Sequence, residues 1–205
     1  MDTTIQHSLG KSMSYSEYRD FVKRLVELKT TSGNEKTKAL ADYTKLNDRR
    51  MKRWDKMVKI SEKAKQSLQS FTENVTWLVI TESWCGDAAH VIPVLNKIAD
   101  LNTNINLRLV LRDENPELMD AFLTNGNRAI PKVIMIDNKT AEVIGTYGPR
   151  PSEAASYVSR FKAKNGTLTA SFKEDLQHWY NTDKGQTVIE DLIKKFDNLK
   201  PSVYL

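Results

Sequence analysis

The sequence predicts an α/β fold: a central, four-stranded mixed sheet with helical extensions at both ends. Two observations predict it. Four short apolar runs between residues 75 and 147 have the length and composition of strands, and segments of helical periodicity separate the first three of them. The order is strand–helix–strand–helix–strand–strand–helix. A helical crossover makes the first two strands parallel, whereas the final hairpin adds antiparallel pairing.

The composition is that of an ordinary globular protein. The chain has 205 residues, of which 40% are hydrophobic and 28% are charged. No apolar run approaches the roughly 18 residues that a membrane span needs, and residues 1–15 hold no apolar run of the secretory kind. The single cysteine rules out an internal disulfide and argues against an oxidising compartment. We therefore expect a cytoplasmic protein with no membrane partner.

Three parts are expected along the chain: a helical N-terminal extension (1–72), a compact domain (73–165) and a helical C-terminal extension that packs on it (166–205). Residues 1–72 hold 16 of the 31 Lys and Arg residues but 9 of the 26 Asp and Glu residues. This surplus of positive charge is typical of a solvated helical face, or of a surface that binds nucleic acid or an acidic partner. No RNA-binding signature, zinc spacing or phosphate loop accompanies it, so nucleic acid is not expected. The extensions cover one side of the sheet or form a homodimer surface.

The N-terminal extension should be helical after a loose start. Residues 1–13 are polar and are expected to be irregular. Ser14 and Glu17 have the spacing of a capping box, which predicts a helix up to about residue 28. A longer helical stretch follows over residues 36–70. It is either one helix or two helices joined near Asn47-Asp48.

The elements of the central domain follow from apolar patterning and turn residues. The strands are expected at residues 75–80, 105–111, 131–136 and 143–147. Helices are expected over residues 85–99, from Asn115-Pro116 with the proline in the first turn, and from Ser152 to about residue 164. Residues 137–139 make the hairpin turn, and two short amphipathic helices should follow residue 166.

The candidate reactive group is Cys85, which lies between the first strand and the following helix. At a helix N-terminus, free backbone N–H groups and the helix dipole favour a thiolate. Ala88 occupies the position at which a second cysteine would complete Cys-x-x-Cys, so Cys85 cannot close a disulfide within the chain. The competing interpretation is that Cys85 is a small buried hydrophobe.

The residues beside Cys85 have both structural and functional interpretations. Asp87 lies in the first helical turn, where the dipole stabilises its charge, but that charge also opposes a thiolate at Cys85. Trp84 either covers the thiol or packs in the core. His90 is about 140° around the helix from Cys85 and should not face it. One cysteine and three scattered histidines predict no metal site.

The central domain resembles the thioredoxin superfamily. The likeness rests on Trp84-Cys85-Gly86 between a strand and a helix, Pro93 within that helix, and Ala129-Ile130-Pro131 at the start of the third strand. The resemblance implies that Ile130-Pro131 is a cis peptide bond facing the cysteine. The phrase Glu-Ser-Trp-Cys-Gly-Asp is similar to a bacterial thioredoxin-like subgroup.

Three departures from thioredoxins bear on the chemistry that the resemblance implies. Ala88 replaces the resolving cysteine, Asp87 replaces a proline, and Val79 stands where thioredoxins keep a buried Asp. Dithiol reductase chemistry is therefore not expected. An Ala88 engineered to trap a mixed disulfide is an alternative that the sequence leaves open.

The resemblance predicts a thiol–disulfide oxidoreductase of cell redox homeostasis that acts through Cys85 by a monothiol route. The predicted substrate contacts are Trp84, Gly86, Asp87, Ala88, Ile130 and Pro131. No bound cofactor is expected; an external thiol such as glutathione, another small thiol or a thiol-bearing protein would release the mixed disulfide. The main alternative is a non-catalytic thioredoxin-fold module that binds a protein or peptide. An iron–sulfur carrier is disfavoured because the sequence lacks the context of monothiol glutaredoxins.

Overall fold

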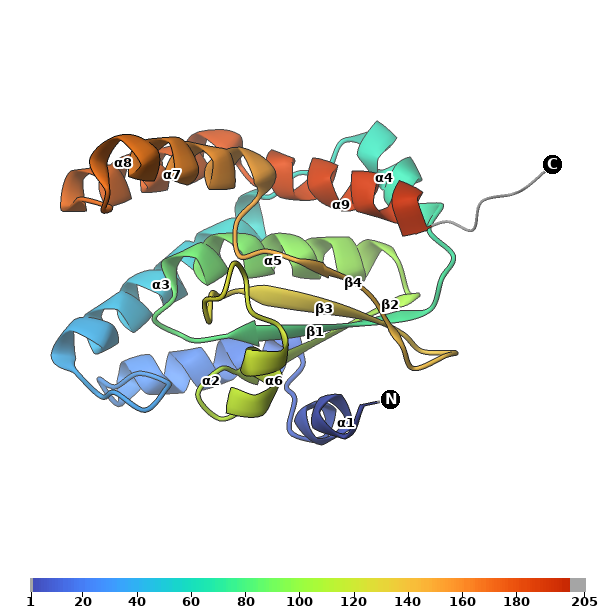
Figure 1. Ribbon diagram of the computed structural model, residues 1–205, viewed down its shortest axis with the longest axis horizontal. Coiled ribbons are helices and arrows are strands. Elements are labelled where there is room, and N and C mark those ends of the chain that lie inside the picture. Colours follow the sequence, from blue (N-terminus) through green and yellow to red (C-terminus); the bar gives the residue numbers. More distant parts are fainter. Residues whose placement is uncertain (1, 200–205) are drawn as a thin grey trace.

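A computed structural model describes residues 2–199 of the chain (Figure 1). The strands are β1 Val75–Thr81, β2 Ile105–Leu111, β3 Lys132–Asp137 and β4 Val143–Tyr147. The helices are α1 Thr3–Gly10, α2 Tyr15–Glu27, α3 Lys38–Met57, α4 Glu62–Gln69, α5 Gly86–Leu101, α6 Pro116–Ala121, α7 Ser152–Asn165, α8 Ala170–Asp183 and α9 Gln186–Leu199.

The four strands form one mixed sheet in the order β2-β1-β3-β4. β1 pairs with β2 in parallel, because α5 carries the chain back to the starting edge of the sheet. β3 pairs antiparallel with both β1 and β4. Every residue of β1 is buried, as expected of a strand with neighbours on both sides and helices on both faces. The predicted fold class is confirmed.

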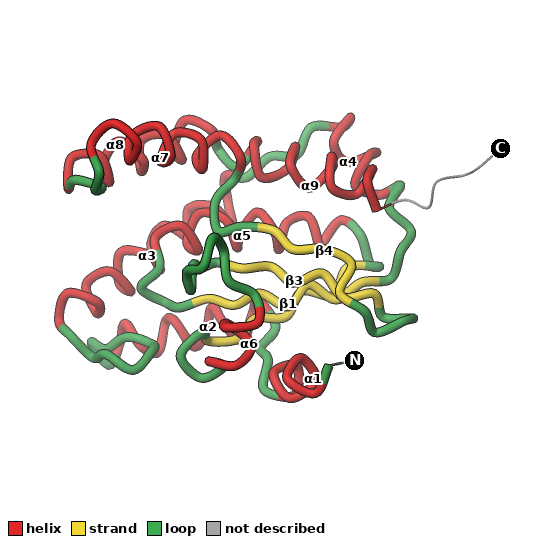
Figure 2. The backbone as a smooth tube through the Cα atoms, in the orientation of Figure 1, coloured by secondary structure: helices red, strands yellow, loops and turns green. Residues whose placement is uncertain are grey.

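Helices cover both faces of the sheet (Figures 1 and 2). α5 lies on one face, and α1, α2 and α6 lie on the other. Beyond α5 runs an outer layer of α4, α7, α8 and α9, in which α9 packs against α4, α5 and α7. α3 packs against both α5 and α2. None of the helices between residues 2 and 199 combines the length and the apolar character needed to cross a bilayer.

The extensions share one hydrophobic core with the sheet. Phe71 precedes β1, and its ring stacks on that of Phe196 from α9 with a centroid distance of 4.1 Å. Trp77 of β1 contacts the same Phe196 ring at 5.8 Å. All three side chains are fully buried. Burial of aromatic rings on this scale ties both ends of the chain to the central strand.

Two sequence-based expectations for the N-terminal extension were wrong. Residues 1–13 are not loose, because α1 forms there: Asp2 caps it by accepting a hydrogen bond from the Thr4 N–H at 2.7 Å, and Ile5 is buried. The break in the long helical stretch is not at Asn47-Asp48. α3 ends at Met57, the chain becomes extended at Val58, and α4 begins after its own cap at Ser61. The predicted capping box of Ser14 and Glu17 is present.

Candidate functional site

The pairing of β1 with β3 brings the cysteine loop and the proline segment together. Because Ile80 pairs with Lys132, the residues that follow β1 lie beside those that precede β3. Cys85 is the N-cap residue of α5, and its Sγ donates a hydrogen bond to the carbonyl oxygen of Ile130 at 3.3 Å. The Ile130-Pro131 peptide bond is cis. The two segments singled out in the sequence therefore meet at the sulfur atom.

The remaining predicted contact residues differ in what they present to solvent. Trp84, Gly86 and Asp87 are half-buried, so part of each faces outward. Ala88, Ile130 and Pro131 are buried. The guanidinium group of Arg112 lies over the Trp84 ring, 4.8 Å from its centroid, in a cation–π contact.

The Cys85 thiol is less accessible and less acidic than a helix N-terminus alone would make it. The residue is 8% exposed. Burial, followed by the negative charge of Asp87, raises the pKa of Cys85 to about 12, although the N–H groups of Ala88 and Asp87 and the charge of Arg150 act in the opposite direction. The expectation that the helix end favours a thiolate is therefore wrong for this resting conformation, because desolvation outweighs the dipole.

The pH dependence of the alkylation rate of Cys85 reports the pKa of its thiol. Only the thiolate reacts, so the rate with iodoacetamide should rise about tenfold per pH unit from about pH 7 to about pH 10, without a plateau. Free glutathione is the control, since its rate should level off above the ordinary thiol pKa of about 8.5. A plateau for Cys85 below that pH would show a depressed pKa and contradict this account of the site.

Asp87 is held by two side chains from later parts of the chain. The Arg150 Nη2 lies 2.6 Å from the Asp87 Oδ2, and the Tyr180 hydroxyl donates to Oδ1 at 2.8 Å. Arg150 comes from the loop between β4 and α7, and Tyr180 comes from α8. Arg150 offsets the negative charge of the carboxylate near the thiol, and only 12% of the Asp87 side chain is exposed. The C-terminal extension therefore reaches the site, which no local pattern in the sequence indicates.

His90 does not serve as a base for Cys85, in line with its predicted place on the helix. Its Nδ1 accepts a hydrogen bond from Trp54 Nε1 at 2.8 Å, and its Nε2 lies 2.8 Å from Gln177 Oε1. The ring stacks on Tyr180 with a centroid distance of 4.3 Å. Burial lowers the pKa of His90 to about 4, so the imidazole is neutral at pH 7.

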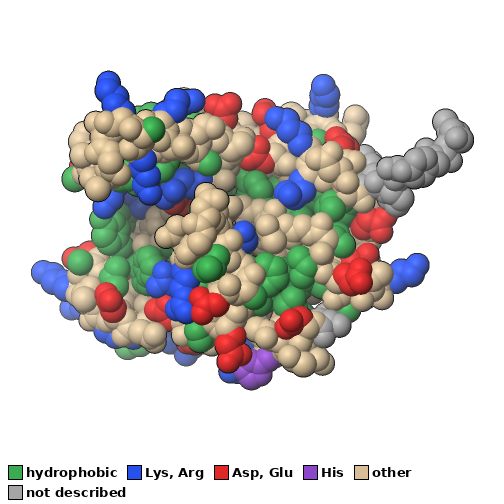
Figure 3. Space-filling model, in the orientation of Figure 1, with side chains coloured by type: hydrophobic (Ala, Val, Ile, Leu, Met, Phe, Trp, Pro, Cys, Tyr) green, Lys and Arg blue, Asp and Glu red, His purple; other side chains and the backbone are tan. Residues whose placement is uncertain are grey.

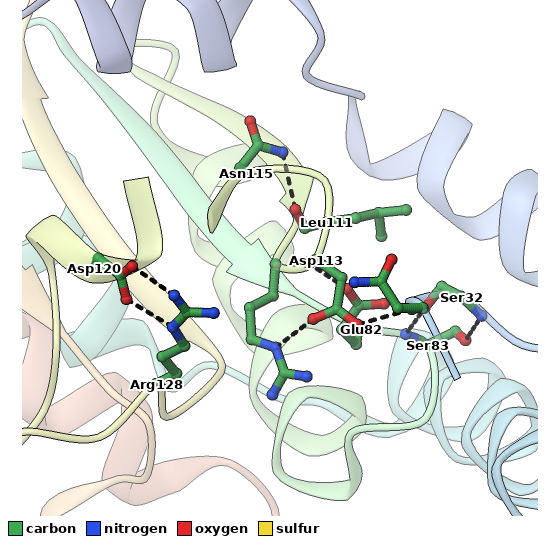
Figure 4. Close-up of polar contacts among 10 residues, drawn as sticks. Ser32, Glu82, Ser83, Leu111, Asp113, Asn115, Asp120 and Arg128 are labelled. Atoms are coloured by element: carbon green, nitrogen blue, oxygen red, sulfur yellow. Dashed lines mark hydrogen bonds and ion pairs between the residues drawn. The ribbon is translucent and has the colours of Figure 1, made fainter. Parts of the chain in front are cut away.

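A buried polar network fastens the N-terminal extension to the cysteine loop (Figure 4). Glu82 accepts hydrogen bonds from the Ser32 hydroxyl and, at 3.0 Å, from the Asp113 N–H. Ser83 accepts from the Ser32 N–H at 3.0 Å, and the Ser32 hydroxyl accepts from the Ser83 N–H at 2.8 Å. Burial raises the pKa of Glu82. These residues position the loop rather than line its open side.

Gly33 allows the segment before α3 to lie close to Asp113 and Trp84. Its φ is +82°, a conformation that favours glycine, and a Cβ at this position would lie 2.7 Å from Asp113 Oδ2 and 3.2 Å from Trp84 Nε1. The segment before α3 therefore passes directly over the loop that carries Cys85. Residues 31–34 thus form part of the wall beside the site.

Restoring a cysteine at position 88 should create a closable disulfide. Positions three apart are neighbours on a helix, and a disulfide joins Cα atoms roughly 4–7 Å apart. Ala88→Cys should therefore lose both free thiols on mild oxidation and regain them on reduction, as counted by alkylation and mass spectrometry. Val91→Cys, also buried but about 9 Å from Cys85 along the helix axis, is the control and should keep its thiols. Two free thiols in oxidised Ala88→Cys would show that the sulfurs do not meet.

Among the residues that the structure describes, no three His, Cys, Asp or Glu side chains lie close enough together to hold a metal ion. The chemistry that this arrangement offers is that of one sulfur atom, a neighbouring carbonyl group and an offset carboxylate.

A family model described as thioredoxin matches residues 33–164, which is more than half of the chain. The chain belongs to the thioredoxin family. The matched region begins at Gly33, so it includes α3 and α4 as well as the predicted central domain. No curated protein matches this thioredoxin-family chain.

Solved structures show the same fold at low identity. A protein of unknown function from Pseudomonas aeruginosa is 18% identical, with a TM-score of 0.60, and the match covers 91% of this chain and 98% of that one. An HIV epitope-scaffold is 17% identical, with a TM-score of 0.58 and coverage of 91% and 99%. Since both matches span nearly the whole of each chain, the likeness in fold includes helical extensions as well as the sheet.

Proposed function

We propose that this thioredoxin-family protein exchanges thiols and disulfides through Cys85 alone. The observation that carries the proposal is the position of Cys85 at the start of α5, with its Sγ 3.3 Å from the carbonyl oxygen of Ile130. A thiolate at Cys85 attacks one sulfur of a partner disulfide. The partner's S–S bond breaks, its other sulfur leaves as a thiolate, and Cys85 is left in a mixed disulfide.

The second half of the cycle needs a thiol from outside the chain. Because position 88 carries no sulfur, an external thiolate must attack the mixed disulfide. Cys85 then leaves as a thiolate, and the external thiol keeps the partner in a new disulfide. Glutathione, another small thiol or a thiol-bearing protein has the required chemistry. A reducing compartment such as the cytoplasm supplies such thiols.

The resting site must open for this reaction. At neutral pH burial keeps Cys85 protonated, and its S–H is directed at the Ile130 carbonyl group. An extended partner segment that pairs with the backbone before Pro131 would compete for that carbonyl group, in the manner of strand addition. Docking of the partner would thus release the thiol next to the disulfide that it attacks.

A non-catalytic binding module is the second candidate, and one observation favours it. A thiol that is 8% exposed, with its pKa raised to about 12, is a poor nucleophile at neutral pH. In that case the surface around Cys85 and Pro131 binds a protein or peptide, and Cys85 only packs.

A glutathione-coupled reductase assay on a small mixed disulfide separates the two candidates. The redox proposal predicts that the wild-type protein accelerates reduction in proportion to its concentration, and that Cys85→Ser abolishes the acceleration. Thermal unfolding of Cys85→Ser checks that the fold persists. Equal, background rates for wild type and Cys85→Ser would leave the binding module as the function.

A further inference from the structure

A cavity lies between α3, α5 and α8. Its volume is about 270 Å³. It is lined by Leu46, Arg49, Arg50, Arg53, His90, Gln177 and Asn181. Figure 3 shows a hollow between the α7–α8 layer and the layer below it, with Lys and Arg side chains at its edge. Three arginines and no acidic residue belong to this lining set, so the charged groups that line the cavity are all positive.

Within residues 2–199, none of the three arginines that line the cavity forms an ion pair with a carboxylate. Arg49 and Arg53 are four residues apart on α3 and Arg50 and Arg53 are three apart, so the like charges lie on neighbouring positions and repel one another. An anion between them would remove that repulsion.

The other polar groups of the cavity also offer donors. Trp54 Nε1 donates to His90 Nδ1, so the neutral imidazole carries its proton on Nε2 and donates it to Gln177 Oε1. This leaves the amide N–H groups of Gln177 free for another partner. Arg53 donates to the Asn181 Oδ1, which occupies the acceptor of that side chain. The cavity therefore presents hydrogen-bond donors and no free carboxylate.

Arg50 links the cavity to the cysteine loop. Its Nη1 donates to Asn47 Oδ1 at 2.9 Å, and Asn47 Nδ2 donates to the Ser83 carbonyl oxygen at 2.9 Å. The same Nη1 lies 3.5 Å from the place that a Cβ on Gly86 would take. The guanidinium group is thus held in a fixed orientation next to the residue that follows Cys85.

We propose that this cavity is a binding site for an anionic group, carboxylate or phosphate, of a small molecule. Planar guanidinium groups form paired, charge-assisted hydrogen bonds with both anions. A ligand seated there lies beside the Cys85 loop, on the side formed by α3 and α8. The site goes beyond the proposed exchange reaction, because it requires no chemistry at the sulfur.

Calorimetric titration with inorganic phosphate and with citrate tests the site at low ionic strength. Wild type should bind at least one of them saturably at one site. Arg49→Gln/Arg53→Gln should weaken binding about tenfold or more, as expected for the loss of charge-assisted hydrogen bonds. Arg160→Gln/Lys162→Gln makes the same charge change on the exposed face of α7 and should leave binding within about twofold of wild type. Stronger binding of phosphate or of citrate then identifies the class of ligand.

Two further measurements test the binding site without a cavity variant and separately from the exchange reaction. In the wild-type protein, the side-chain amide resonance of Gln177 should shift during the titration, which needs no variant to fold. Cys85→Ser should bind as wild type does, so failure of the exchange reaction would leave the site intact. The proposal is overturned if neither anion binds saturably, if the Gln177 amide does not respond, or if the cavity variant and the α7 variant bind equally well.

Discussion

Arg150→Met should lower the free energy of unfolding by about 3 kcal/mol, because it leaves the Asp87 carboxylate in a largely buried place without its counter-charge. The two side chains are 25% and 12% exposed, and their charged atoms are 2.6 Å apart. The Tyr180 hydroxyl would remain as a donor to Asp87 but carries no charge. Urea denaturation at neutral pH measures the loss.

The matched control is the exposed ion pair of Arg128 and Asp120. These groups are 2.5 Å apart, but their side chains are about half exposed, at 53% and 52%. Arg128→Met should therefore cost less than about 1 kcal/mol. Asp87→Asn/Arg150→Met should cost less than the sum of the two single changes, since it removes both charges. Equal losses for Arg150→Met and Arg128→Met would show that burial of the Asp87 pair does not matter.

The Arg150 variant also has a chemical consequence at the sulfur. Arg150 lowers the pKa of Cys85, and Asp87 raises it. Without Arg150 the carboxylate acts unopposed, so alkylation of Cys85 should be slower than in wild type at the same pH. Asp87→Asn should have the opposite effect, and the two rates together separate the charge at the site from a general loss of stability.

Acidification should destabilise the protein through His90 by about 3 kcal/mol between about pH 7 and pH 4. Burial lowers the pKa of the folded-state imidazole to about 4, whereas an unfolded histidine has a pKa of about 6.5. The unfolded chain therefore binds a proton first. The stabilisation is present above the unfolded pKa and is lost as the pH falls through the folded pKa. A proton on Nδ1 would also remove the acceptor of Trp54.

Comparing how the stability of wild type and of a His90 variant depends on pH separates the contribution of His90 from that of the carboxylates, which titrate in the same pH range. His90→Gln should be less stable at neutral pH but should lose about 3 kcal/mol less than wild type on acidification to about pH 4. His178→Gln, at an exposed position of α8, is the control and should follow wild type. Parallel stability curves for wild type and His90→Gln would contradict a neutral, buried imidazole.

Local patterning was sufficient to predict the sheet and the position of the cysteine. Continuous apolar runs predicted the strands, and the helical crossover after β1 predicted that β1 and β2 are parallel. Thr3–Gly10 was missed because its sequence is polar, and α1 depends on burial of Ile5 against distant elements. The α3–α4 break lies at Val58, which is buried and extended, and no helix-breaking residue marks this position in the sequence.

The surroundings of Cys85 were harder to predict because they are assembled from distant segments. Tyr180 and Arg50 reach the loop from distant parts of the chain, and neither has a spacing that points to position 85. The sequence could indicate a helix end and its dipole but not the degree of burial. Burial decides the direction in which the pKa of Cys85 moves.

Reaction of the protein with glutathione disulfide at about pH 9, followed by intact mass spectrometry, tests the exchange chemistry of Cys85 most directly. The account predicts one glutathionyl group per chain, located on Cys85, absent from Cys85→Ser and removed by added glutathione. The urea-unfolded chain is the control for reagent quality, because its cysteine is freely accessible. A folded wild-type protein that stays unmodified while the unfolded chain reacts would contradict the proposed function.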